Sequence, residues 1–92
     1  MKLRIRAKAA DDLEAIHAWI AQDNTGAAAE MVGRIRRRIE RLGRPGLAYL
    51  GRPALFEGTR ELVEAPDIIV DELRDARDEL VVLAIFHGAQ SR

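Results

Sequence analysis

Apolar residues recur at three- and four-residue steps in two stretches of the first half of the chain, which is the spacing of amphipathic helices. The first stretch predicts a helix over residues 8–22. Its buried face comprises Ala10, Leu13, Ile16 or His17, and Ile20. The second stretch predicts a helix with Thr25 as its N-cap. Its apolar positions are Ala28, Met31, Val32, Ile35, Ile39 and Leu42. Because the connection between them is so short, the two helices should form an antiparallel hairpin.

The remaining apolar pattern has a period of two, which is typical of β-strands. Residues 3–6 alternate apolar and basic side chains, and three later stretches alternate in the same way, at residues 59–64, 68–73 and 79–86. Between the helices and these strands, residues 43–58 contain glycines and prolines that cannot continue a helix. We expect this segment to form an ordered loop.

This order of elements predicts an α+β fold of the form β-α-α-β-β-β. In such a fold the antiparallel helical hairpin packs on one face of a small, mainly antiparallel sheet. The sequence shows neither an internal repeat nor a linker, so we expect a single domain over residues 1–92.

The last predicted strand is apolar on both faces. Strict alternation would place Leu80, Val82, Ala84 and Phe86 on one face and Val81, Leu83 and Ile85 on the other. Two helices can cover only one face of the sheet. The other face therefore needs the 43–58 loop, a second copy of the chain or a different protein, because a monomer seldom exposes a large apolar patch.

Several apolar and aromatic side chains are candidates for contact with a partner. They are Trp19, Tyr49, Leu50, Phe56, Val81, Leu83 and Ile85. Trp19 could equally belong to the core or anchor a partner at the helical surface, and the sequence leaves both interpretations open.

The composition narrows the class of protein. The sequence contains no cysteine, which excludes disulfides and thiolate metal sites. It has no apolar run of the ~18 residues that a membrane span requires, and its first residues lack the continuous apolar segment of a secretory signal. We therefore expect a cytoplasmic protein that uses no metal or other cofactor and has no membrane partner.

The formal net charge is zero, but the charge is unevenly distributed. Residues 24–56 carry seven arginines and two glutamates, whereas residues 57–92 carry four arginines and nine acids. In the predicted second helix, four arginines fall on or beside the polar face, at Arg34, Arg37, Arg38 and Arg41. This cluster is either a solvated face or a surface that binds an acidic target or a nucleic acid.

Four segments together resemble a known family of proteins. They are ADDLEAIHAWIAQDN at residues 10–24, VGRIRRRIERLGRPG at 32–46, GTREL at 58–62 and HGAQ at 87–90. In this order they resemble the RelE/ParE superfamily of toxins from bacterial type II toxin-antitoxin systems, and the chain is more similar to the ParE branch. The resemblance implies a toxin that arrests growth and is neutralised by a cognate antitoxin, which we expect to be of the ribbon-helix-helix type.

The resemblance implies two possible mechanisms. ParE-like toxins poison DNA gyrase, whereas RelE-like toxins are endoribonucleases that cut mRNA on the ribosome. Cleavage of RNA needs a general base, a general acid and cations that stabilise the developing negative charge. The sequence offers only Arg60 and His87 for these tasks. In the same region it has Asp71 and Glu72, where relatives commonly have a tyrosine and a basic residue, and Ala84, where many have an arginine.

The residues therefore favour gyrase poisoning without catalysis. We interpret Arg60 as a structural cation that pairs with Glu57, Glu61 or Glu64 across the sheet, and His87 as a hydrogen-bonding residue at a strand end. Two alternatives remain open at this stage. One is a ribosome-dependent nuclease that uses Arg60 and His87, and the other is a non-toxic member of the superfamily that retains only antitoxin binding.

Overall fold

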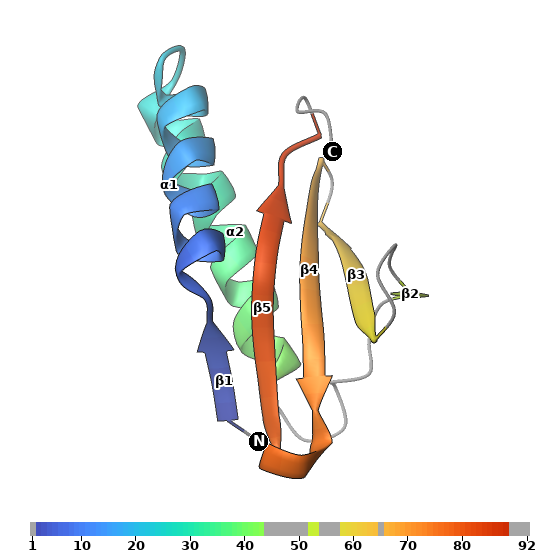
Figure 1. Cartoon of the computed structure of the whole chain (residues 1–92). Coiled ribbons are helices and arrows are strands. Elements are labelled where there is room, and N and C mark those ends of the chain that lie inside the picture. The colour runs from blue at the N-terminus through green and yellow to red at the C-terminus, as the bar shows by residue number, and fades with distance from the viewer. Residues whose placement is uncertain (1, 44–51, 54–57, 65, 89–92) are drawn as a thin grey trace.

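The computed structural model describes residues 2–43, 52–53, 58–64 and 66–88. Its helices are α1 (Ala7–Ala21) and α2 (Thr25–Leu42), and its strands are β1 (Lys2–Ile5), β2 (Arg52–Pro53), β3 (Thr59–Glu64), β4 (Asp67–Arg74) and β5 (Glu79–Phe86). A short 3-10 turn, Asp75–Arg77, joins β4 to β5. The strands form one sheet in the order β1-β5-β4-β3-β2, in which β1 is parallel to β5 and every other pair is antiparallel. Both helices lie on the same face of this sheet (Figure 1).

The predicted α+β fold is confirmed, with one addition. Part of the predicted 43–58 loop forms the two-residue strand β2, in which Arg52 is opposite Glu61 and Pro53 is opposite Arg60 of β3. A proline fits here because β2 is the outermost strand and one of its edges needs no backbone donor. Gly58 precedes β3 with a positive φ of 81°, a conformation that glycine adopts without strain.

The hydrophobic core lies between the helical hairpin and the sheet. Its buried members are Ala9, Leu13, Ile16, Ile35, Ile39, Leu42, Leu62, Ile69, Leu80, Val82 and Ile85. Each large side chain in this set contributes about 1.5–3 kcal/mol through the apolar surface that it removes from water. The core draws on both helices and on three strands, so the hairpin and the sheet stabilise each other.

The structure corrects the predicted details of both helices. The N-cap of α2 is Asn24, not Thr25, because the Asn24 side chain accepts a hydrogen bond of 2.9 Å from the Ala27 N–H. In α1 the buried face begins at Ala9, whereas Ala10 and His17 are exposed. Two adjacent alanines carry almost no hydrophobic signal that distinguishes one from the other, so the sequence placed the start of the buried face one residue too late. The predicted positions Leu13, Ile16 and Ile20 lie in the core or against it.

The predicted faces of β5 are wrong beyond Leu83. Val70 is opposite Ala84, but the next residue, Asp71, is opposite Val82. Leu83 is therefore an extra residue on β5, and such an insertion reverses the alternation of side chains. As a result Ile85 joins Leu80 and Val82 in the core.

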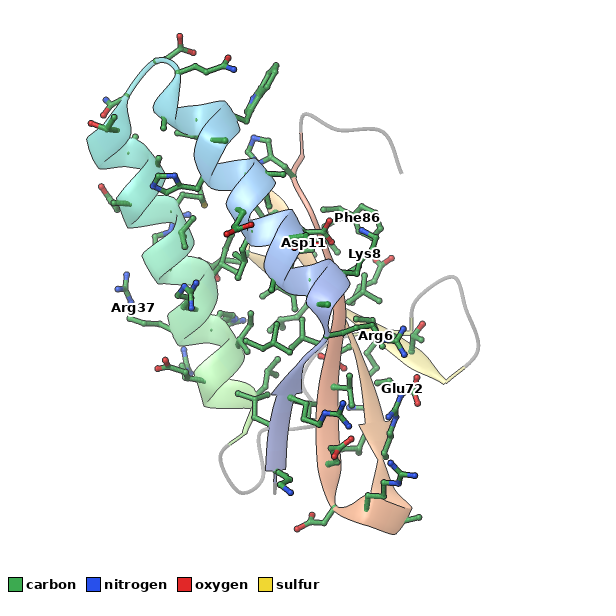
Figure 2. The ribbon with its side chains drawn as sticks, turned by 60° about the vertical axis from the view of Figure 1, so that its left-hand side comes forward. Arg6, Lys8, Asp11, Arg37, Glu72 and Phe86 are labelled. Atoms are coloured by element: carbon green, nitrogen blue, oxygen red, sulfur yellow. The ribbon has the colours of Figure 1, made fainter. Side chains whose placement is uncertain are left out.

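The first turns of α1 complete the free edge of β5. β1 pairs only with residues 79–82, after which the Arg6 N–H donates to the Val82 carbonyl at 3.0 Å. Farther along the strand, the Ile85 N–H donates to Asp12 Oδ2 at 2.9 Å. Lys8 binds the same carboxylate at 2.8 Å and places its ammonium group 5.7 Å from the ring centre of Phe86 (Figure 2). The Asp12 carboxylate on α1 therefore accepts the hydrogen bond that a longer β1 would have accepted through its backbone.

This edge contact makes Asp12 a residue on which stability should depend. Asp12→Ala should lower the free energy of unfolding by about 1–3 kcal/mol, because it leaves the Ile85 N–H without its acceptor. Urea denaturation followed by circular dichroism measures this change. The matched control is Asp11→Ala, an exposed acid one position earlier (Figure 2). If both variants lose the same stability, the Asp12 contact does not support the sheet edge.

Candidate functional site

The four arginines singled out in the sequence line one hollow at the surface. Arg34, Arg37, Arg38 and Arg41 lie three, four and seven residues apart on α2, which places them along one stripe of the helix. Glu64, the last residue of β3, completes the lining of the hollow. We call these five residues the arginine groove.

Glu64 lies between two of the guanidinium groups of the arginine groove. Its Oε1 is 3.7 Å from Arg34 Nε, and its Oε2 is 3.7 Å from Arg38 Nε. These are ion pairs that are too long to be hydrogen bonds. Arg38 Nε is buried and has no hydrogen-bond partner among the described residues. The groove therefore keeps hydrogen-bond donors and an excess of positive charge that Glu64 does not neutralise.

This arrangement can bind anions. A guanidinium group presents several N–H donors in a planar fork that matches a carboxylate or a phosphate. Arg34 and Arg38 are partly withdrawn from water, with side chains 40% and 29% exposed, and partial burial strengthens such contacts. The sequence placed the four arginines correctly beside one another, but it gave no indication that Glu64 would join them, because the β3-to-α2 contact is a tertiary one.

His87 forms a buried pair with Asp67. His87 follows β5 directly, and Asp67 is the first residue of the neighbouring β4. His87 Nδ1 lies 2.6 Å from Asp67 Oδ1, and the two residues are 9% and 0% exposed. At Gly88, a Cβ atom would collide with the Pro66 carbonyl oxygen. The His-Gly pair thus joins the end of β5 to the start of β4, in agreement with the interpretation of His87 as a strand-end residue.

Arg60 lies opposite a different buried acid. It is directly across from Asp71 in the β3-β4 register. The predicted partner Glu57 lies outside the described residues, and pairing with Glu57, Glu61 or Glu64 stays a prediction. Asp71 is 0% exposed, and neither carboxylate oxygen has a hydrogen-bond partner within the described part of the chain. Burial raises the pKa of Asp71 to about 6, and the positive charge of Arg60 opposes this rise.

The structure does not bring the two candidate catalytic residues together. Arg60 is opposite Asp71, and His87 contacts Asp67. These two acids are four residues apart on β4, which corresponds to roughly 13 Å along the strand. Arg60 and His87 therefore belong to different parts of the same sheet.

The candidate partner-binding residues are found in contrasting environments. Trp19 is 58% exposed, and Leu83 is partly exposed. Val81 and Ile85 are only 3% and 1% exposed, so their side chains are inaccessible in the isolated chain. The other three candidates, Tyr49, Leu50 and Phe56, lie outside the described residues. Among the four described members of the set, Trp19 is the large side chain most exposed to solvent.

Neither a metal site nor a membrane-spanning helix is found among the described residues. They contain no group of three or more histidine and acidic side chains arranged to hold a metal ion. None of their helices is both long enough and apolar enough to cross a membrane.

Comparisons with known proteins identify a family of toxins and solved structures of the same fold. A family model described as "ParE toxin of type II toxin-antitoxin system, parDE" matches residues 3–92. A protein of Sinorhizobium fredii named "Putative toxin Y4kP" is 33% identical over 97% of this chain and 90% of its own length. Among solved structures, a chain of the chromosomal ParDE toxin-antitoxin system from P. aeruginosa is 27% identical, with a TM-score of 0.81 over 95% of both chains. The Mycobacterium tuberculosis RelBE2 toxin-antitoxin complex contains a chain that is 18% identical, with a TM-score of 0.70 over 94% of this chain and 95% of that one, and shares the fold.

The buried acid Asp71 makes stability depend on pH. Because its pKa rises from 3.8 to about 6 on folding, the folded state binds the proton more tightly. The chain should therefore lose stability as the pH rises from about 4 to 6. Asp71→Asn should remove this loss and stabilise the fold at pH 7.5 by about 1–3 kcal/mol, with the gain disappearing near pH 4. Thermal unfolding across this pH range measures the effect.

The control for this measurement is Asp11→Asn, which changes an exposed acid. It should show no such pH-dependent gain. An equal gain in both variants, or a gain for Asp71→Asn that does not depend on pH, would contradict the assignment to the buried carboxyl group.

Proposed function

This chain belongs to the family of ParE toxins of type II toxin-antitoxin systems, and from this membership we propose that it arrests bacterial growth by poisoning DNA gyrase. The observation that carries the proposal is the match of the ParE toxin family over residues 3–92, nearly the whole chain. The RelE/ParE resemblance associates this branch with gyrase. We expect the protein to act in the cytoplasm, where gyrase and the chromosome are.

The local chemistry favours gyrase poisoning over RNA cleavage. A nuclease site needs an acid-base group and a cation near the same phosphate. Arg60 and His87 are separated along the sheet, and His87 is held in a buried contact with Asp67. The residue opposite Arg60 is Asp71, which when ionised repels RNA. These observations support a toxin that acts by binding.

We propose that a cognate antitoxin of the ribbon-helix-helix type covers part of this chain. The similar structures come from a ParDE toxin-antitoxin system and a RelBE2 toxin-antitoxin complex, which supports an antitoxin partner. Trp19 is the first candidate for its anchor, because large aromatic side chains dominate many protein interfaces and this one is 58% exposed.

Induction of the gene without its antitoxin tests the proposed target. Gyrase poisoning should cause filamentous cells, DNA-damage signalling and gyrase-linked DNA breaks, and co-expression of the antitoxin should prevent all three. An immediate stop in translation with cleaved mRNA would overturn the proposal in favour of the nuclease. Normal growth at a verified level of folded protein would favour a member that retains only antitoxin binding.

His87→Gln separates a structural from a catalytic role of this histidine. We expect the variant to stay toxic, with a lower melting temperature, because glutamine replaces the contact with Asp67 only in part. Growth arrest at matched expression and thermal unfolding are the two measurements. Loss of toxicity in a variant that remains folded would show that His87 takes part in chemistry.

A further inference from the structure

The described residues that line the arginine groove carry more positive than negative charge. Four arginines and a single glutamate line it. We propose that the groove binds an acidic segment of a partner polypeptide, whose carboxylates join Glu64 among the guanidinium groups. This inference concerns binding by the purified chain, so it stands or falls independently of gyrase as the target.

The environment of Glu64 is the first argument for carboxylates. This side chain already lies between Arg34 and Arg38, at 3.7 Å from each Nε, and remains 26% exposed. Its contacts are longer than hydrogen bonds, so they do not satisfy the donor of Arg38 Nε. That nitrogen is buried without a hydrogen-bond partner among the described residues.

The spacing of the arginines is the second argument. Arg34 and Arg41 are seven residues apart on α2, or roughly 10 Å along the helix axis. An extended peptide advances about 3.3 Å per residue and points alternate side chains to the same side. Two acidic side chains at positions i and i+2 of such a peptide fit the length of the groove.

The position of Arg37 is the third argument. A Cβ atom at Gly33 would lie 3.3 Å from Arg37 Nη1, so the guanidinium group lies close to this glycine on α2. The absence of a side chain at residue 33 gives the guanidinium room at this place. Arg37 can therefore lie against α2 and still line the groove with the other three arginines.

The charge distribution favours a polypeptide over a nucleic acid. Tight binding of a phosphate backbone depends on a broad positive field, but this chain has a net charge of zero and an excess of acids in residues 57–92. Glu64 adds a negative charge inside the groove itself. A short acidic segment needs only the local cluster of four arginines.

Fluorescence anisotropy with labelled probes tests the proposal on the purified full chain. The probes are a twelve-residue peptide with glutamate at alternate positions, the same peptide with glutamine in place of glutamate, and a single-stranded DNA oligonucleotide of equal charge. We expect the acidic peptide to bind and the glutamine peptide to fail. We also expect the oligonucleotide to bind more weakly than the acidic peptide at the same salt concentration.

Three variants locate the binding. The double variant Arg37→Ala with Arg41→Ala should weaken peptide binding at least tenfold, because both arginines are exposed and line the groove. The control Arg36→Ala removes an exposed arginine of α2 that does not line the groove, and it should change the affinity less than twofold. Glu64→Gln should bind the peptide about threefold to tenfold more tightly, because it removes a nearby like charge.

The gain from Glu64→Gln protects the test against misfolding, since a damaged protein would not bind more tightly. The proposal is overturned if the acidic peptide does not bind, or if the double variant and Arg36→Ala have equal effects. Tighter binding of the oligonucleotide than of the peptide would also overturn it, and would assign the groove to nucleic acid.

Discussion

A backbone N–H in a packed sheet needs an acceptor, and at β5 this requirement organises the N-terminal half of the chain. β5 lies between β1 and β4, but β1 reaches only to Val82. The chain then turns into α1, and the carboxylate of Asp12 accepts the Ile85 N–H. This hydrogen bond fixes α1 against the edge of β5, and α2 follows because it forms a hairpin with α1. The arginine groove depends on it in turn, because α2 must lie against β3 for Glu64 to reach Arg34 and Arg38.

The two fully buried aspartates of the sheet, Asp67 and Asp71, differ in whether they have a hydrogen-bond partner. Asp67 has a partner in His87, and together they fix the junction between the end of β5 and the start of β4. Asp71 is buried without a hydrogen bond among the described residues, with Arg60 as the charge opposite it. An ionised acid in such a place costs stability. We find no structural gain that offsets this cost, so Asp71 is an acid that the fold tolerates.

The amphipathic patterns were sufficient to predict the architecture, because helical and strand periods are local properties of a sequence. They could not predict the register shift at Leu83, since an extra residue in a strand leaves the apolar run Leu80–Phe86 looking continuous. Nor could they reveal the partners of His87, Asp12 and Glu64. The contacts of His87 with Asp67, of Asp12 with Ile85 and of Glu64 with Arg38 each join residues at least 20 apart in sequence, so they depend on how strands and helices are placed in space. The four arginines were found because their spacing on one helix is itself a local pattern.

The pairing of β1 with β5 has a consequence for how the protein is made. Lys2 is opposite Glu79, so β1 can form its backbone hydrogen bonds only after β5 has been synthesised. The core is incomplete until then as well, because Leu80, Val82 and Ile85 all come from β5. Contacts between such distant parts of a chain form slowly and late. A chain that is terminated before β5 would lack the strand that joins β1 to β4, so the sheet can close only after β5 has been made.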